Sequence, residues 1–272
     1  MTRLVVDAHV HIWGSELLDV PWLQDPAVAV LRREFTLDEL TPALDAAGVD
    51  RVVLVAAEET LAGTRLLLER AAGDSRVGGV VGWVNLTERF AATELAHLRS
   101  MTGGSLLCGI RQSTAEWQDS HWSALESNLA ELEHRDLVLE LLSPAVQLDR
   151  VAALASDWPE LRIVVDHLGL PATPEDPTWR SALDALVAHP SVAVKVSSLP
   201  FDEREVGSAV EYARSALGAD RLIAGSDWPV VLRRASAVDE WARLHRVVAQ
   251  WLPAERDAVL GSTAARFYRI AA

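Results

Sequence analysis

The chain has 272 residues, half of them hydrophobic, and a formal net charge of −14. This charge argues against a nucleic-acid partner, which needs clustered Lys and Arg, and no apolar run reaches the ~20 residues of a membrane helix. The single cysteine, Cys108, excludes an internal disulfide. The N-terminus lacks the pattern of a secretory signal, so the expected location is the cytoplasm.

Eight short, nearly continuous apolar runs predict strands of a buried parallel sheet, at 4–11, 51–56, 77–84, 106–111, 137–141, 161–166, 192–196 and 221–225. Helical patterns alternate with them, at 37–47, 61–72, 91–101, 122–135, 145–156, 179–188, 205–217 and 237–251. Eight alternations without a linker predict a single (β/α)8 TIM barrel over residues 1–272. The alternative is a doubly wound open sheet. It is disfavoured because His-Ile-Trp, and not a glycine-rich phosphate loop, follows the first strand.

The first strand ends in two histidines with one residue between them, His9 and His11. Alternate residues of a strand face the same side, so both rings point together and can share a divalent metal ion. Asp7 shares their face deeper in the barrel, where a supporting role is expected. The long irregular segment 13–34 that follows forms either a lid over the barrel mouth or an ordinary surface loop.

Other polar side chains come at or near the ends of later strands, where the catalytic groups of a TIM barrel gather. They are Arg111, Gln112, Glu140, His167, Asp227 and Trp228. Each has an ordinary structural alternative, such as a helix cap for Asp227 or an ion pair for Arg111. Asp166 and Lys195 are expected to be structural, Lys195 as one partner of a salt bridge between layers. The coincidence of so many polar groups at one rim favours an active site.

Five segments in chain order resemble the amidohydrolase-related family, most closely its branch of sugar-acid and dicarboxylate lactonases. These are Asp7–Trp13, Gly82–Leu86, Gly109–Gln112, Asp166–Pro171 and Gly225–Val230, and the chain closes with the similar Gly261–Tyr268. The resemblance implies an amidohydrolase barrel and a central cluster of His9, His11, His167 and Asp227. Some members hold one divalent ion, usually zinc or manganese, and others hold none. Glu58, Gln112, Glu140 and Ser198 stand where relatives often carry other residues, which leaves the substrate open.

The resemblance implies a hydrolase that opens the lactone of a sugar acid or a carboxylated lactone. Asp227 would take a proton from the attacking water and return it to the leaving alkoxide, with His167 and Arg111 as further catalytic groups. The expected metal ligands are His9, His11, His167 and Asp227, with zinc favoured, manganese possible and a metal-free mechanism open. The expected substrate contacts are Trp13, Arg111, Gln112, Glu140 and Trp228. The alternatives are a metal-dependent decarboxylase and a non-catalytic binding barrel, and a homodimer is compatible with the sequence.

Overall fold

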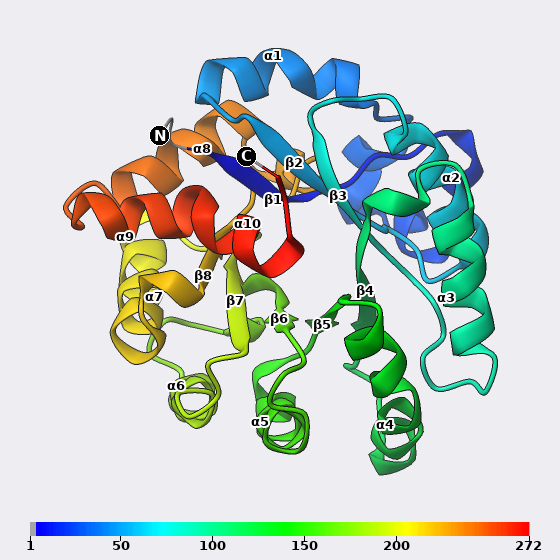
Figure 1. Cartoon of the computed structure of the whole chain (residues 1–272). Coiled ribbons are helices and arrows are strands. Elements are labelled where there is room, and N and C mark those ends of the chain that lie inside the picture. The colour runs from blue at the N-terminus through cyan, green and yellow to red at the C-terminus, as the bar shows by residue number, and fades with distance from the viewer. Residues whose placement is uncertain (1–3, 272) are drawn as a thin grey trace.

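Eight parallel strands, paired in chain order, form the centre of the structure, a computed structural model that describes residues 4–271 (Figure 1). They are β1 (Val6–Val10), β2 (Arg51–Val55), β3 (Val77–Gly82), β4 (Leu107–Ser113), β5 (Val138–Leu142), β6 (Ile163–Val165), β7 (Val192–Val196) and β8 (Leu222–Ala224). The end of β1 meets the segment after β8 through two backbone hydrogen bonds, His11 N to Trp228 O at 2.7 Å and Asp227 N to His9 O at 2.9 Å. The predicted (β/α)8 barrel is confirmed.

Each strand is followed by a helix on the outside of the barrel (Figure 1). These helices are α1 (Leu37–Ala47), α2 (Leu61–Ala71), α3 (Ala91–Ser100), α4 (Asp119–His134), α5 (Leu148–Asp157), α6 (Pro177–Ala185), α7 (Glu203–Leu217) and α8 (Ala237–Val247). The bounds of α1 match the prediction because both ends carry strong signals. The Thr36 hydroxyl accepts from Glu39 N, and Gly48 ends the helix in the left-handed conformation at φ 69°.

Two apolar layers hold the barrel together. The larger layer packs the strands against the surrounding helices. The smaller one fills the inside of the barrel with short side chains, mostly Val and Ala, from β1, β2, β3, β5, β6, β7 and β8. Gly225 allows β8 to approach β1, because a Cβ atom there would lie 2.7 Å from the Cβ of His9.

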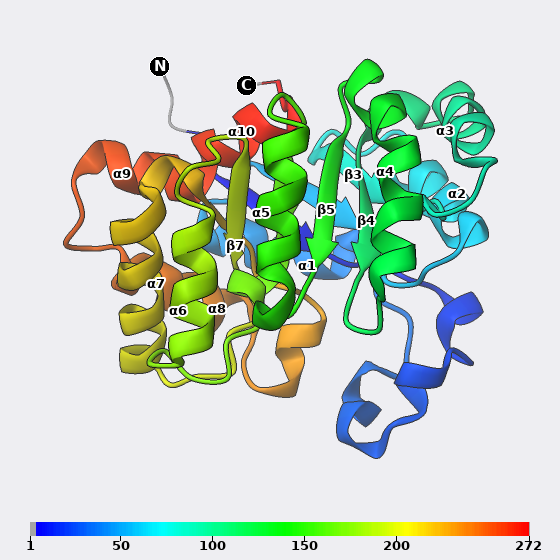
Figure 2. The same ribbon diagram turned by 90° about the horizontal axis from the view of Figure 1, so that it is seen from below.

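The C-terminal part of the chain closes the end of the barrel where the strands begin. It forms α9 (Pro253–Asp257), a π-helical turn (Ala258–Ser262) and α10 (Thr263–Tyr268), none of which the hydrophobic pattern predicted. Phe267 and Tyr268 of α10 complete the inner apolar layer. Figure 2 shows these helices at one end of the barrel and the segment 15–31 at the other. No helix within residues 4–271 combines the length and the hydropathy that crossing a membrane requires.

The segment between β1 and α1 folds into three short 3₁₀ helices, Ser15–Leu17, Pro21–Gln24 and Pro26–Leu31. Its side chains Val20, Pro21, Trp22, Val28 and Leu31 line one wall of a cavity at the carboxyl ends of the strands. The sequence left open a lid or an ordinary surface loop, and in the structure the segment forms one side of the cavity at the barrel mouth.

An ion pair between Glu16 and Arg70 of α2, 2.6 Å long, ties this wall to the barrel. The hydrogen bond from Arg70 lowers the pKa of Glu16 from 4.5 to about 2. A lowered folded-state pKa stabilises the folded contact above pH 4.5, and this contribution is lost as the pH falls towards about 2. We therefore expect amide exchange protection of residues 14–18 to decline between pH 5 and pH 3.

Arg70→Met provides the comparison for this measurement. We expect it to reduce the protection of residues 14–18 already at pH 6, by no more than about fivefold because a partly exposed pair contributes roughly 0–1 kcal/mol. Between pH 5 and pH 3 the amide exchange protection of residues 14–18 in this variant should then change little. A variant that keeps the wild-type pH dependence would show that another group anchors the wall.

Candidate active site

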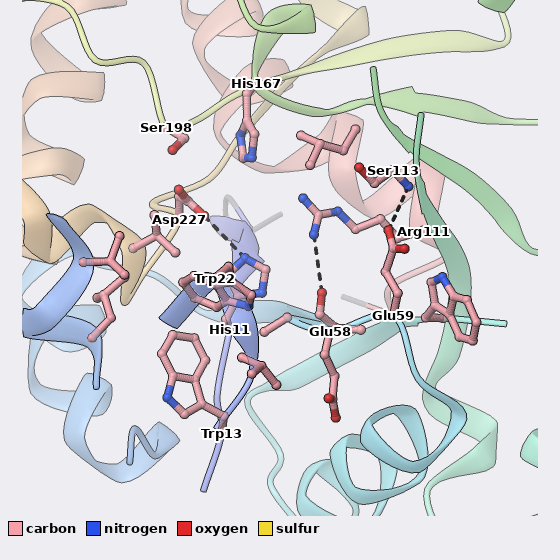
Figure 3. A pocket seen from close by; sticks show the side chains of 18 of the residues that line it. His11, Trp13, Trp22, Glu58, Glu59, Arg111, Ser113, His167, Ser198 and Asp227 are labelled. Carbon is pink, nitrogen blue, oxygen red and sulfur yellow. Dashed lines mark hydrogen bonds and ion pairs between the residues drawn. The ribbon is translucent and has the colours of Figure 1, made fainter. Parts of the chain in front are cut away.

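A cavity of about 690 Å³ opens at the carboxyl ends of the strands. Figure 3 shows His11, Arg111, His167 and Asp227 around it, each contributed by a different part of the barrel. Its lining divides into an apolar group and a polar group of side chains. Three tryptophans, Trp13, Trp22 and Trp83, belong to the first, and Glu58, Glu59, Thr60, Ser113, Ser198 and Arg233 to the second.

Three buried side chains meet at the end of β1. The Nε2 atoms of His9 and His11 are 3.1 Å apart, and Asp227 Oδ1 lies 3.6 Å from the first and 3.4 Å from the second. Asp227 reaches this place because its backbone is left-handed at φ 59° directly after β8. The β1 strand and the turn after β8 thus assemble a cluster that the strand-end rule predicted.

The spacing of these three atoms fits a divalent metal ion. A tetrahedral zinc ion with bonds of ~2.0–2.2 Å separates its ligand atoms by roughly 3.3–3.6 Å. The two distances to Asp227 lie in this range, and the 3.1 Å between the two Nε2 atoms is slightly shorter. The His11 Nδ1 atom lies 2.8 Å from the carbonyl oxygen of Val55, to which it must donate, so the lone pair of Nε2 faces the cluster. Such a hydrogen bond to the outer nitrogen is the usual support of a metal-bound histidine. The donor set of His9, His11 and Asp227 could therefore hold a divalent metal ion.

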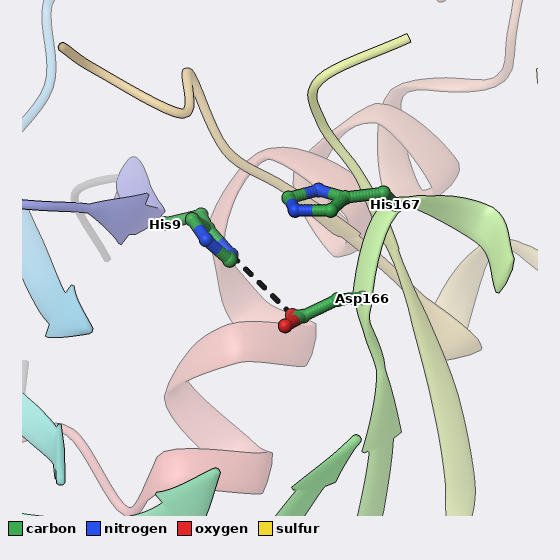
Figure 4. A group of neighbouring side chains, drawn as sticks. All are labelled: His9, Asp166 and His167. Atoms are coloured by element: carbon green, nitrogen blue, oxygen red, sulfur yellow. Dashed lines mark ion pairs between the residues drawn. The ribbon is translucent and has the colours of Figure 1, made fainter. Parts of the chain in front are cut away.

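A second group of possible ligands shares His9 and adds Asp166 and His167 (Figure 4). Asp166 Oδ1 lies 3.4 Å from His9 Nδ1, and its Oδ2 accepts from Arg111 Nε at 2.8 Å. Strand β6 ends at Val165, and His167 follows in a left-handed turn at φ 53°. This turn, which strand alternation could not reveal, allows both Asp166 and His167 to face the site.

Lys195 forms the floor below His9. Its Nζ is fully buried and lies 2.6 Å from Glu140 Oε1, 3.3 Å from Asp166 Oδ1 and 3.1 Å from His9 Nδ1. Tyr268 donates from below to Glu140 Oε2 at 2.6 Å. A continuous set of charged and polar contacts therefore runs from α10, through the barrel, to the cluster at its mouth.

Burial governs the protonation of these groups, and their neighbours modify it. Burial lowers the pKa of His9 well below its ordinary value, and the charge of Lys195 lowers it further. The pKa of His167 is also lowered, mainly by burial. Burial alone would raise the pKa of Asp227, but the hydrogen bond with His11, followed by electrostatic interaction with the His167 and His9 rings, outweighs it and lowers the pKa. Neutral imidazoles beside an ionised carboxylate are the forms suited to metal binding and to proton transfer.

The structure places the predicted residues in three ways. His11, Trp13, Arg111, His167 and Asp227 line the cavity, and His9 lies fully buried beneath them. Gln112, Glu140 and Trp228 are not among the residues that line the cavity, and their contact with substrate stays a prediction. Gln112 donates to the carbonyl oxygens of Val84 and Arg111. Glu140 is held by Lys195 and Tyr268, and Trp228 packs edge to face on Phe35.

Two site residues were assigned only structural roles from the sequence. Asp166 and Lys195 both contact His9 directly. The salt bridge expected of Lys195 is present, but inside the barrel beneath the cluster. Lys195 could have been selected from the sequence, because it lies near the carboxyl end of β7. Polar groups at the carboxyl ends of barrel strands gather at the active site, and the other site residues were selected by this rule.

Comparisons with known proteins identify several that are similar to this chain. A family model described as amidohydrolase matches residues 6–270. The chain is 33% identical to an L-fucono-1,5-lactonase of Burkholderia multivorans, over 99% of this chain and 97% of that protein. It is 33% identical to the L-fucono-1,5-lactonase of Burkholderia ambifaria, over 97% and 95%. A crystal structure of an amidohydrolase from Burkholderia multivorans with bound zinc superimposes with a TM-score of 0.89 at 30% identity, covering 98% of this chain and all of that one.

Proposed function

Because the chain belongs to the amidohydrolase family, we propose that it is a hydrolase that opens the lactone ring of a sugar acid. One observation carries the proposal: His9, His11, His167, Arg111 and Asp227 converge at the mouth of the barrel. Two relatives named L-fucono-1,5-lactonase, similar over nearly their whole length, support the reaction class.

Ring opening by this site needs one water molecule. The Asp227 carboxylate accepts a proton from the water as its oxygen bonds to the lactone carbonyl carbon. The carbon–oxygen bond of the ring then breaks, and Asp227 returns the proton to the leaving ring oxygen, which leaves a hydroxy acid. Arg111 lines the cavity, with its Nε donating to Asp166 at 2.8 Å and its Nη1 to the carbonyl oxygen of Ala56 at 3.4 Å (Figure 3). Its remaining N–H groups can stabilise the charge on the lactone carbonyl oxygen.

His167 has a fixed ring beside this carbonyl position. Its Nδ1 lies 2.8 Å from the hydroxyl of Ser197. When this hydroxyl donates to Nδ1, the neutral ring carries its proton on Nε2 and can donate to the substrate. We assign His9, His11 and Asp227 as the residues that would hold one divalent ion, zinc before manganese, with His167 as the further candidate ligand. Such an ion, when bound, would lower the pKa of water and polarise the carbonyl group.

The charges of the cavity favour a neutral, hydroxyl-rich lactone over a carboxylated one. Three carboxylates, Glu58, Glu59 and Asp227, line it together with two guanidinium groups, Arg111 and Arg233. Carboxylates accept hydrogen bonds from hydroxyl groups but repel an anion. The guanidinium of Arg111 is already paired with Asp166. Trp13, Trp22 and Trp83 offer flat apolar surfaces to the CH faces of a sugar ring.

A pH-indicator assay on a panel of lactones, combined with metal analysis of the purified protein, tests this function. We expect kcat/KM for aldonolactones to exceed that for muconolactone-type and pyrone dicarboxylate lactones by at least about tenfold, the effect of roughly 1.4 kcal/mol of charge repulsion. Faster turnover of the carboxylated lactones would reverse the substrate assignment. Carbon dioxide release without ring opening would identify a decarboxylase, and tight binding without turnover would identify a binding protein. Cytoplasmic location and a homodimer stay predictions from the sequence.

A further inference from the structure

Lys195 is the only lysine in the chain, since 24 of its 25 basic residues are arginine. It lies within β7 and is fully buried. Arginine has a planar, branched head, whereas the lysine ammonium is a compact point charge with three N–H donors and no acceptor. All the remaining 24 basic residues are arginine, so the one ammonium side chain lies at the floor of the candidate active site.

The contacts of Lys195 determine which nitrogen of His9 carries the proton. Lys195 Nζ lies 3.1 Å from His9 Nδ1 and forms a hydrogen bond with it. Because an ammonium group can only donate, His9 Nδ1 must accept with its lone pair. A neutral His9 ring then carries its single proton on Nε2.

His11 gives an independent check on this assignment. Its Nδ1 lies 2.8 Å from the carbonyl oxygen of Val55, which can only accept, so His11 carries its proton on Nδ1. The His11 Nε2 atom therefore has a free lone pair. The contact of 3.1 Å between the two Nε2 atoms is then a hydrogen bond from His9 to His11. The two assignments agree without any buried clash of protons.

A metal ion bound by the same cluster requires the other tautomer of the His9 ring. Both Nε2 atoms would have to present lone pairs, so the proton of His9 would move to Nδ1, where Asp166 Oδ1 lies 3.4 Å away. The ammonium of Lys195 would then face an N–H group instead of an acceptor. We propose that Lys195 is a positioning residue that holds His9 as the Nε2–H tautomer and thereby weakens metal binding at the site. This effect on metal binding can be measured without turnover, whatever lactone the protein hydrolyses.

The first test measures zinc binding by competition with a chromogenic chelator. Lys195→Met removes the N–H donors at similar length, and we expect it to bind zinc at least tenfold more tightly than the wild type. Loss of one positive charge could produce the same gain. The matched variant is therefore Lys195→Met with Glu140→Gln, which removes one charge of each sign and leaves no carboxylate at Glu140 without its partner.

The double variant separates the two explanations. If Lys195 acts through the tautomer of His9, the double variant keeps the gain in zinc affinity. A return to wild-type affinity would show that charge alone was responsible and would overturn the proposal, as would unchanged or weaker binding in Lys195→Met. Thermal unfolding of each variant confirms that folded proteins are compared.

The second test uses the wild-type protein and does not depend on the folding of any variant. Nitrogen NMR of histidine distinguishes Nδ1–H from Nε2–H rings, and His9→Gln assigns the signal of His9. We expect the metal-free protein to show His9 protonated on Nε2 and His11 on Nδ1, and added zinc to move the proton of His9 to Nδ1. Labelled lysine gives a single ammonium signal, which should shift on the same titration. A metal-free His9 protonated on Nδ1 would contradict the proposal.

Discussion

Asp227→Asn is expected to lower kcat for lactone opening by about 10²–10⁴-fold, the usual contribution of a positioned general base. The asparagine side chain has the same shape but cannot accept the proton of water. Asp227 suits the role because it is almost fully buried, lines the cavity and has a pKa held below its ordinary value, so the carboxylate is ionised across the neutral range.

Single-turnover and steady-state rates with an aldonolactone measure this effect, together with the zinc content of the variant. Asp19→Asn is the matched control, because Asp19 is an exposed carboxylate on the cavity-wall segment, and its kcat should stay within about twofold of wild type. If Asp227→Asn retained full kcat, Asp227 would have no part in proton transfer. A loss of zinc without a loss of kcat would assign it to metal binding alone.

Asp7→Ala is expected to cause the largest loss of stability, about 3–5 kcal/mol in the free energy of unfolding. The carboxylate is fully buried and accepts three hydrogen bonds. They come from Ser226 N at 2.8 Å, His9 N at 3.3 Å and Trp241 Nε1 at 3.0 Å. These donors belong to β1, the turn after β8 and α8, so the substitution leaves three buried N–H groups unpaired where the barrel closes.

Urea unfolding followed by tryptophan fluorescence measures this difference. Asp7→Asn keeps one acceptor oxygen, so its free energy of unfolding should fall less than that of Asp7→Ala. Asp50→Ala is the matched control, because Asp50 also accepts from a backbone group, Val5 N at 2.8 Å, but is exposed to solvent. Its loss should stay below about 1 kcal/mol, since water replaces the lost partner. If Asp7→Ala and Asp50→Ala lowered the free energy of unfolding equally, burial of the Asp7 carboxylate would not explain its contribution to stability.

The sequence predicted the barrel well because each element carries its own local signal. Thr36 and Gly48 defined both ends of α1, and all eight strands lie within or beside apolar runs. The helices α9 and α10 were missed because five or six residues are too few for a clear helical period. Their position is set by tertiary contacts: Gly261 packs against the backbone of Leu4, where a Cβ atom would lie 1.8 Å from the carbonyl oxygen.

Part of the candidate site followed from strand-end position. This rule identified His9, His11 and Asp227, which the structure brings together. It could not show whether a side chain reaches the cavity. Gln112 lies on the face of β4 opposite to Arg111, and the depth of Glu140 in the barrel depends on Tyr268, distant in sequence.

The contact between Tyr268 and Glu140 also has a consequence for synthesis of the protein on the ribosome. Glu140 holds Lys195, Lys195 holds His9, and Tyr268 is made after all three. A nascent chain that has already exposed the first seven strands still lacks both Asp227 and the helix that closes the barrel. The cluster at the barrel mouth is therefore incomplete until Asp227 has been made, and a ribosome that stalls before Tyr268 produces a chain in which Glu140 lacks this buried hydrogen bond.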